Sequence, residues 1–223
     1  MTLALYGHPL SSYTWKPLIA LWENGTPFDY RSIAHDDPAG EDNGAALKAH
    51  WPPGKFPLLL DGKRVIPEST PIIEYLDRHY PGPTRWIPDD PDAAFETRLL
   101  DRIFDTHVMA GLQAIVAEHI PFITAAPDPN RIARARGQLD AIYPWLDARL
   151  AGRDWAIGDA FTLADCAAAP SLYYADRVHP IPAALANLTD YKARLIARPS
   201  VARALDEARP YRAFFPLGDP EDD

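Results

Sequence analysis

The stretch FPLLLDGKRVIPESTPIIEYL, residues 56–76, decides the fold. An apolar run follows Pro57, Asp61 and Gly62 supply turn chemistry, and a second short apolar run comes after the turn, which predicts a β-hairpin. The segment 69–71, Ser-Thr-Pro, is a typical helix start. Apolar side chains then recur at the helical spacing, at Ile72, Ile73 and Leu76. The sequence therefore predicts a hairpin that runs directly into a helix.

A polar pair, Glu68 and Ser69, lies at the join between this hairpin and its helix. The first turn of a helix leaves backbone N–H groups without partners, and the positive end of the helix dipole lies there too. The join is therefore suited to binding a carboxylate.

The residues before this stretch predict a strand, a helix and a second strand. Residues 3–6 are short and apolar, a helix begins after Ser11 or Ser12 and stops at residues 24–25, and residues 28–33 alternate in polarity. The usual right-handed crossover makes these two strands parallel neighbours. After a polar link, which we expect to be a loop with a short helix, the hairpin and its helix follow. This order resembles the thioredoxin-like arrangement.

The residues after position 80 predict a different kind of domain. Prolines and glycine break the pattern over residues 81–91, and nearly every later signal is helical. Asn130 is the expected cap of one helix, and residues 162–165 resemble a capping box before an Ala-rich, buried helix. The first long helix has one apolar stripe, formed by Phe95, Leu99, Ile103, Phe104 and Val108, that could run on toward Ile120. The predicted fold is an α+β two-domain protein: a thioredoxin-like domain (1–80), a linker (81–91) and an all-helical bundle domain (92–223).

Composition excludes several classes of protein. The formal net charge is −9, with 31 acidic against 22 basic residues, which argues against nucleic acid as a partner. No apolar run approaches the length of a membrane span and the first residues do not resemble a signal peptide, so we expect a cytoplasmic protein without a membrane partner. The seven histidines show no paired ligand spacing, so we expect no metal site. The single cysteine, Cys166, is expected to be a small core residue.

Two motifs together give the chain a resemblance to a known family. Residues 54–57, Gly-Lys-Phe-Pro, precede the hairpin, and Glu68-Ser69 follows it. With a thioredoxin-like first domain and a helical second domain, the chain resembles the cytosolic glutathione transferases along essentially its whole length. The resemblance implies that glutathione is the co-substrate, bound by Lys55, Phe56, Pro57, Glu68 and Ser69. Phe56 stands where the family usually has valine.

The chemistry of the γ-glutamyl end of glutathione agrees with this assignment. That group has one carboxylate and one ammonium. Ser69 and its backbone N–H suit the carboxylate, and Glu68 suits the ammonium.

Glutathione chemistry also needs a group that stabilises the thiolate. A thiol has a pKa of about 8.5, and one charge-assisted hydrogen bond of roughly 1.5 to 3 kcal/mol lowers it by about one to two units. The loop Ser-Ser-Tyr-Thr-Trp at 11–15 is similar to the Ser-Ser-Cys-Ser-Trp start of the zeta class, whose first serine is the thiolate partner. Ser11 is therefore the first candidate and Ser12 its competitor. Tyr13, which replaces the zeta-class cysteine, and Tyr6 are further alternatives.

The resemblance also predicts the second substrate and the assembly. We expect a small hydrophobic electrophile against the first long helix, near His107, Met109, Leu112 and Gln113, and a homodimer formed through that region. The implied function is conjugation of glutathione to this electrophile, as in detoxification. Two alternatives stay open: a zeta-type glutathione-dependent isomerase, and a glutathione- or ligand-binding protein without catalysis.

Overall fold

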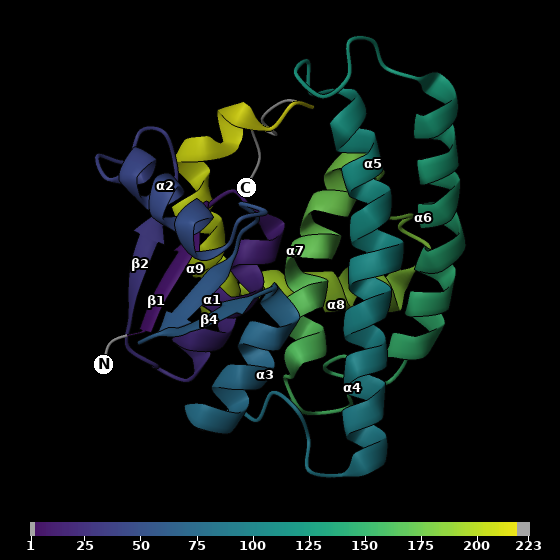
Figure 1. Ribbon diagram of the computed structural model, residues 1–223. Coiled ribbons are helices and arrows are strands. Elements are labelled where there is room, and N and C mark those ends of the chain that lie inside the picture. Colours follow the sequence, from purple (N-terminus) through teal and green to yellow (C-terminus); the bar gives the residue numbers. More distant parts are fainter. Residues whose placement is uncertain (1–2, 218–223) are drawn as a thin grey trace.

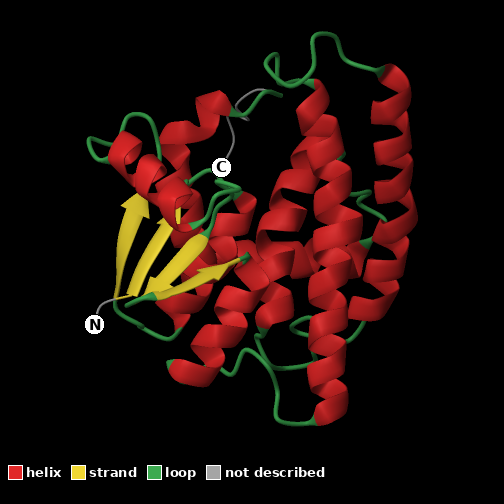
Figure 2. Ribbon diagram, in the orientation of Figure 1, coloured by secondary structure: helices red, strands yellow, loops and turns green. Residues whose placement is uncertain are grey.

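The computed structural model describes residues 3–217 of the chain, so positions 1–2 and 218–223 of the two expected domains lie outside it. A four-stranded sheet with its helices forms one side of the molecule, and a bundle of helices forms the other (Figures 1 and 2). The fold class predicted from the sequence, a thioredoxin-like domain followed by a helical domain, is confirmed.

The sheet has the strand order β2-β1-β3-β4. Strands β1 (Leu3–Gly7) and β2 (Phe28–Ser32) pair in parallel, as the crossover rule predicted. Strands β3 (Leu58–Asp61) and β4 (Arg64–Pro67) form the predicted hairpin, in which Asp61 faces Arg64. Between them Gly62 has φ +59°, a left-handed conformation that favours glycine.

Three helices belong to the sheet domain: α1 (Ser12–Glu23), α2 (Gly40–His50) and α3 (Ser69–His79). Ser11 caps α1 through its side chain, and Gly25 follows the helix with φ +58°. Only Glu68 separates the end of the hairpin at Pro67 from the start of α3 at Ser69. α1 packs against α7 and α9 of the helical domain, and the starts of α1 and α3 line the cavity between the two domains.

The helical domain is built around α7 (Leu163–Val178), in which nearly every residue is buried. The segments that surround it are α4 (Pro91–Ile103), the π-helical segment η1 (Phe104–Met109), α5 (Ala110–Glu118), α6 (Pro129–Leu150), α8 (Ala186–Ala197), α9 (Pro199–Ala208) and the 3₁₀ segment η2 (Arg209–Phe214). The predicted capping box is present, because the Asp165 carboxylate accepts from the backbone N–H of Thr162 at 2.8 Å. Cys166 is fully buried, as expected.

The apolar stripe of the first long helix is only partly buried, and the expected cap of α6 is wrong. Phe95 and Leu99 of α4 are 69% and 37% exposed, whereas Thr97 and Asp101 of the same helix are buried. An apolar stripe marks a face that avoids water, and the sequence does not say whether this domain covers it. The cap of α6 is Asp128 and not Asn130, since the Asp128 carboxylate accepts from the Asn130 backbone N–H at 2.9 Å.

Within residues 3–217 no helix is both long enough and apolar enough to span a membrane.

Candidate functional site

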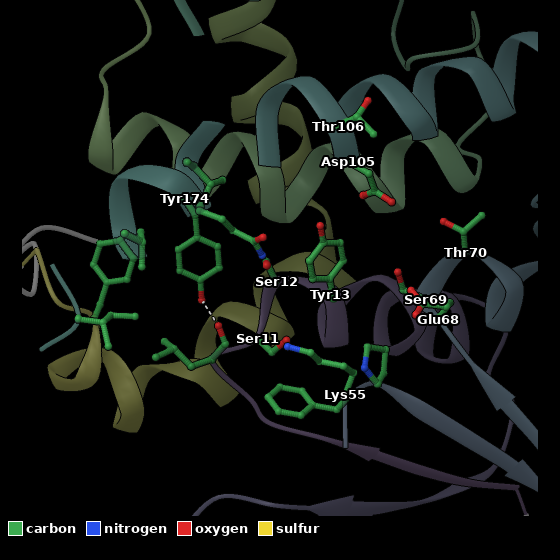
Figure 3. A pocket seen from close by; sticks show the side chains of 18 of the residues that line it. Ser11, Ser12, Tyr13, Lys55, Glu68, Ser69, Thr70, Asp105, Thr106 and Tyr174 are labelled. Atoms are coloured by element: carbon green, nitrogen blue, oxygen red, sulfur yellow. Dashed lines mark hydrogen bonds between the residues drawn. The ribbon is translucent and has the colours of Figure 1, made fainter. Parts of the chain in front are cut away.

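A cavity of about 970 Å³ lies between the two domains (Figure 3). The start of α1, the loop before β3 and the start of α3 form one wall, and α4, η1, α5, α7 and the C-terminal segment form the other. The lining residues predicted from the sequence are Ser11, Ser12, Tyr13, Lys55, Phe56, Pro57, Glu68, Ser69, Leu112 and Gln113. Segments from the two ends of the chain therefore meet at one site, whose lining residues run from Leu10 to Pro216.

Ser11 occupies the N-cap of α1 at the cavity wall. Its Oγ accepts a hydrogen bond from the Thr14 backbone N–H at 3.3 Å. A hydroxyl that accepts through a lone pair keeps its O–H hydrogen for another partner. The positive end of the α1 dipole also lies here and favours a negative charge. Ser12, the first residue of the helix, lines the cavity beside it.

The residues around the cis Phe56-Pro57 peptide line the cavity, and Figure 3 shows Lys55 at its lower edge. Pro57 is buried, Phe56 packs against the small core cluster beneath α2, and Lys55 is exposed at the rim. Lys55 supplies a positive charge and residue 56 a backbone edge next to the sheet, both of which suit a peptide-like ligand.

Glu68 and Ser69 lie at the start of α3 and face the same cavity. Glu68 has φ +72°, although a residue with a Cβ rarely adopts positive φ. Such a conformation costs on the order of 1 to 3 kcal/mol and is typical of functional positions. The Glu68 side chain makes no capping bond to the helix and is exposed, whereas Ser69 is buried. A carboxylate and a helix start, side by side, match a group that carries both an ammonium and a carboxylate.

The two tyrosine candidates lie in different places. Tyr13 is half-buried in the cavity wall, and its hydroxyl points towards the helical domain near Asp105 (Figure 3). Burial, followed by the nearby Asp105 carboxylate, raises the pKa of Tyr13 to about 12, so this hydroxyl stays protonated at neutral pH. Tyr6 is not among the lining residues. It is buried in the core cluster beneath α2, where its hydroxyl accepts from Arg31 Nη1 at 2.6 Å.

Two of the four residues expected to bind the second substrate line the cavity, and the other two do not. Leu112 and Gln113 line the cavity, but Met109 is buried in the core and His107 is exposed outside the cavity. These two residues therefore do not line this cavity, and they belong to the π-helical segment η1, whose turns are wider than those of an α-helix. The cavity-facing positions consequently pass from Arg102 and residues 105–106 directly to residues 112–113.

Several lining residues were not predicted from the sequence. They are polar or aromatic side chains without a local motif: Trp51, Thr70, Arg102, Asp105 and Tyr174. The Asp105 carboxylate is held by the buried ammonium of Lys16, with Oδ2 at 2.8 Å from Nζ. Burial raises the pKa of Asp105, and the Lys16 charge acts in the opposite direction.

Apolar side chains also line the cavity, among them Leu10, Val116, Ile120, Phe214 and Phe215. Leu10 and Phe215 lie next to Tyr174, which Figure 3 shows across the cavity from Glu68. The Glu68 side is therefore suited to a zwitterionic ligand, and the Tyr174 side to a hydrophobic one. Within residues 3–217 no three His, Cys, Asp or Glu side chains are grouped so that they could hold a metal ion.

Comparison with known proteins gives the same family for both domains. The model of the glutathione S-transferase N-terminal domain matches residues 5–84, and that of the C-terminal domain matches residues 103–199. The probable maleylacetoacetate isomerase of Vibrio cholerae is 28% identical over 214 residues, which cover 94% of this chain and 98% of that protein. Glutathione S-transferase GstB of Escherichia coli is 28% identical and covers 91% of this chain and 97% of its own length.

Among solved structures, the glutathione S-transferase of Methylobacillus flagellatus with glutathione bound has a TM-score of 0.78 at 24% identity. The match covers 91% of this chain and 98% of that one. This likeness shows a shared fold.

Proposed function

Because the chain belongs to the glutathione S-transferase family, we propose that it binds glutathione in the interdomain cavity, stabilises the thiolate with Ser11, and directs the sulfur at a small electrophile. The observation that carries this proposal is the meeting of two helix starts in one cavity. Ser11 caps α1, and the Glu68-Ser69 pair opens α3. The start of α1 would bind the thiol of glutathione, and the start of α3 would bind its γ-glutamyl end.

The polar wall fits glutathione along its length. Glu68 pairs with the γ-glutamyl ammonium, and Ser69 with the backbone at the start of α3 binds the carboxylate beside it. The backbone of Phe56 pairs with the cysteinyl residue, and Pro57 and Lys55 complete the wall towards the glycyl end.

Ser11 then donates its O–H to the sulfur, while its Oγ still accepts from Thr14. A charge-assisted hydrogen bond of roughly 1.5 to 3 kcal/mol lowers the thiol pKa by about one to two units. The thiol proton passes to water, the thiolate attacks the electrophilic carbon, and a C–S bond forms. In a substitution the leaving group departs with its bonding electron pair, and in an addition the displaced π-electron pair takes up a proton from water. The electrophile lies against Leu112 and Gln113, with the apolar end of the cavity around it.

Two measurements test the binding and the thiolate. Calorimetric titration with glutathione should give saturable binding, and no binding at millimolar concentrations would reject the proposal. The absorbance of the bound thiolate against pH should give a pKa below the free value of about 8.5. Ser11→Ala should return this pKa towards the free value, while Ser12→Ala should leave it low. The reverse pattern would assign the role to Ser12.

A second candidate function is glutathione-dependent isomerisation of a double bond. It is favoured by the similarity to the probable maleylacetoacetate isomerase of Vibrio cholerae. In this reaction the thiolate adds to the conjugated double bond, rotation follows, and the same thiolate leaves. With a cis-enone and glutathione, an isomerase gives the trans-enone and conserves glutathione, whereas a transferase consumes it. Binding without either product would favour a ligand-binding role.

We also propose a homodimer in which α4 contributes to the contact. Phe95 and Leu99 present apolar side chains on the outer face of this helix. Sedimentation equilibrium should give twice the chain mass, and Phe95→Glu should shift it to the monomer. As the sequence predicted, we expect the protein to act in the cytoplasm, in detoxification.

A further inference from the structure

The peptide group between Leu10 and Ser11 is held at both of its polar atoms. The Ser11 N–H donates to the His8 carbonyl at 2.9 Å. The Leu10 carbonyl accepts from the Tyr174 hydroxyl at 2.8 Å (Figure 3). A peptide group is planar, so holding its N–H and its C=O fixes the plane from which the Ser11 side chain projects.

The two holding bonds have different origins. The first bond lies within the loop itself, but Tyr174 belongs to α7, 164 positions along the chain and in the other domain. A further bond to this loop comes from the sheet domain itself, because Trp15 Nε1 in α1 donates to the Pro9 carbonyl at 2.6 Å. The direction of Ser11 is therefore set partly by the helical domain.

Tyr174 itself has little freedom to move. It is 5% exposed, and its ring lies 5.2 Å from that of Trp15 and 5.7 Å from that of Phe215. Burial raises the pKa of Tyr174, so the hydroxyl remains a hydrogen-bond donor at any pH at which the protein works. A rigid donor thus meets a carbonyl one residue before the proposed thiolate partner.

We propose that Tyr174 is a positioning residue for thiolate formation: its hydroxyl holds the Leu10 carbonyl so that the Ser11 O–H points at the sulfur. The inference rests on the proposed function, since it assigns to Tyr174 an action through Ser11. The ring of Tyr174 also lines the cavity. Tyr174→Phe separates the two contributions, because it keeps the ring and removes only the hydroxyl.

The main experiment titrates the bound thiol by its thiolate absorbance in wild-type protein and in Tyr174→Phe. We expect the pKa to rise by about one unit, which is about tenfold less thiolate below the pKa. At neutral pH kcat should fall by a similar factor. The affinity for glutathione, measured about one unit below the lower bound-thiol pKa so that the thiol is protonated in both proteins, and the KM for the electrophile should stay within about twofold, because the Glu68-Ser69 end and the ring are unchanged.

Tyr143→Phe is the matched control. Tyr143 is also a buried tyrosine that donates to a backbone carbonyl, that of His179 at 3.1 Å, but it lies in α6 and does not line the cavity. The Tyr143→Phe variant should therefore leave the thiolate pKa and kcat unchanged, even if its thermal unfolding midpoint falls as much as that of Tyr174→Phe. Equal effects of both variants on the thiolate pKa would mean a general structural loss and would overturn the proposal.

A double-mutant cycle with Ser11→Ala tests whether Tyr174 acts through Ser11. In the Ser11→Ala background, Tyr174→Phe should have no further effect on the thiolate pKa. The same shift in both backgrounds, or no shift in the single variant, would overturn the positioning role while leaving the proposed function intact. A wild-type protein that binds no glutathione, or does not lower its thiol pKa, would overturn both.

Discussion

Lys16 Nζ lies 2.8 Å from Asp101 Oδ1, and the two side chains are 0% and 1% exposed. The contact joins α1 of the sheet domain to α4 of the helical domain. Asp105 and Thr70 complete the group, so the three donors of the ammonium meet three partners. Because Thr70 and Asp105 also line the cavity, this buried cluster connects the domain interface to the site.

Replacing Lys16 by methionine should destabilise the protein strongly. The change keeps most of the side-chain volume but leaves two buried carboxylates without their cation, a loss of about 3 to 5 kcal/mol. Urea denaturation measures the free energy of unfolding. Arg98→Met is the control, since it breaks an exposed pair with Glu74 that contributes at most about 1 kcal/mol. Losses of equal size would contradict a special role for the buried cluster.

Replacing Glu68 by glycine should improve stability and impair binding. Glycine adopts φ +72° without strain, so the free energy of unfolding should rise by about 1 kcal/mol. Loss of a charge-assisted bond should weaken glutathione binding by about tenfold or more. Glu68→Gln keeps the strain and removes the charge, so it should weaken binding with no gain in stability. A glycine variant that is less stable than wild type would argue against strain at this position.

Introducing tryptophan at position 113 should narrow the electrophile end of the cavity. Gln113 is exposed in the cavity wall, so the new side chain has room to project into the cavity without disturbing the core. We expect kcat/KM for a bulky electrophile to fall by about tenfold, a factor that a single misfit in a pocket commonly produces. Glutathione affinity, measured by calorimetry, should not change. His107→Trp is the control, because it introduces the same residue nearby but outside the cavity, and it should leave kcat/KM unchanged. If kcat/KM fell in His107→Trp and not in the variant at position 113, the electrophile would bind near His107 instead.

Asp61 should contribute stability that depends on pH. The hydroxyls of Tyr75 and Tyr80 each donate to Asp61 Oδ2 at 2.7 Å, and these bonds lower the pKa of Asp61. A carboxyl whose pKa is lower in the folded state stabilises that state above the unfolded pKa of about 3.9, and this contribution disappears as the pH falls through the folded value. The stability difference between wild type and Asp61→Asn should therefore be larger at pH 6 than at pH 3. Urea unfolding at both values measures it, and a difference that grew on acidification would contradict the sign.

The features of the fold that were predictable are those with local chemistry. Gly62 marked a turn, Ser11 a helix cap and Asp165 a capping box, and the structure has each in its expected role. Each of these residues acts on backbone groups within a few positions, so a short window of sequence contains the whole interaction.

The features that were missed depend on distant partners. Asp101 is buried because Lys16 meets it from 85 positions away, and Tyr174 reaches the cavity because α7 packs against α1. The hydrophobic periodicity of the sequence predicts neither contact, because it assigns a charged residue on a helix to the solvent-exposed face. For the site, the sequence placed Ser11 and Glu68 in one cavity through family motifs, but the roles of these residues remain predictions.

The π-helical segment η1 carries a consequence for how this site can diverge between related genes. Each residue of an α-helix advances by about 100°, and a π turn holds about one residue more than an α turn. Because the wide turn takes up this extra residue, removing one codon within positions 104–109 would restore α-helical spacing and leave the directions of Leu112 and Gln113 relative to Arg102 about the same. A one-codon deletion elsewhere between Arg102 and Leu112 would instead rotate these two side chains by about 100°. Related genes can therefore differ by one codon at η1 while both the electrophile end and the glutathione-facing wall, encoded before residue 72, stay in place.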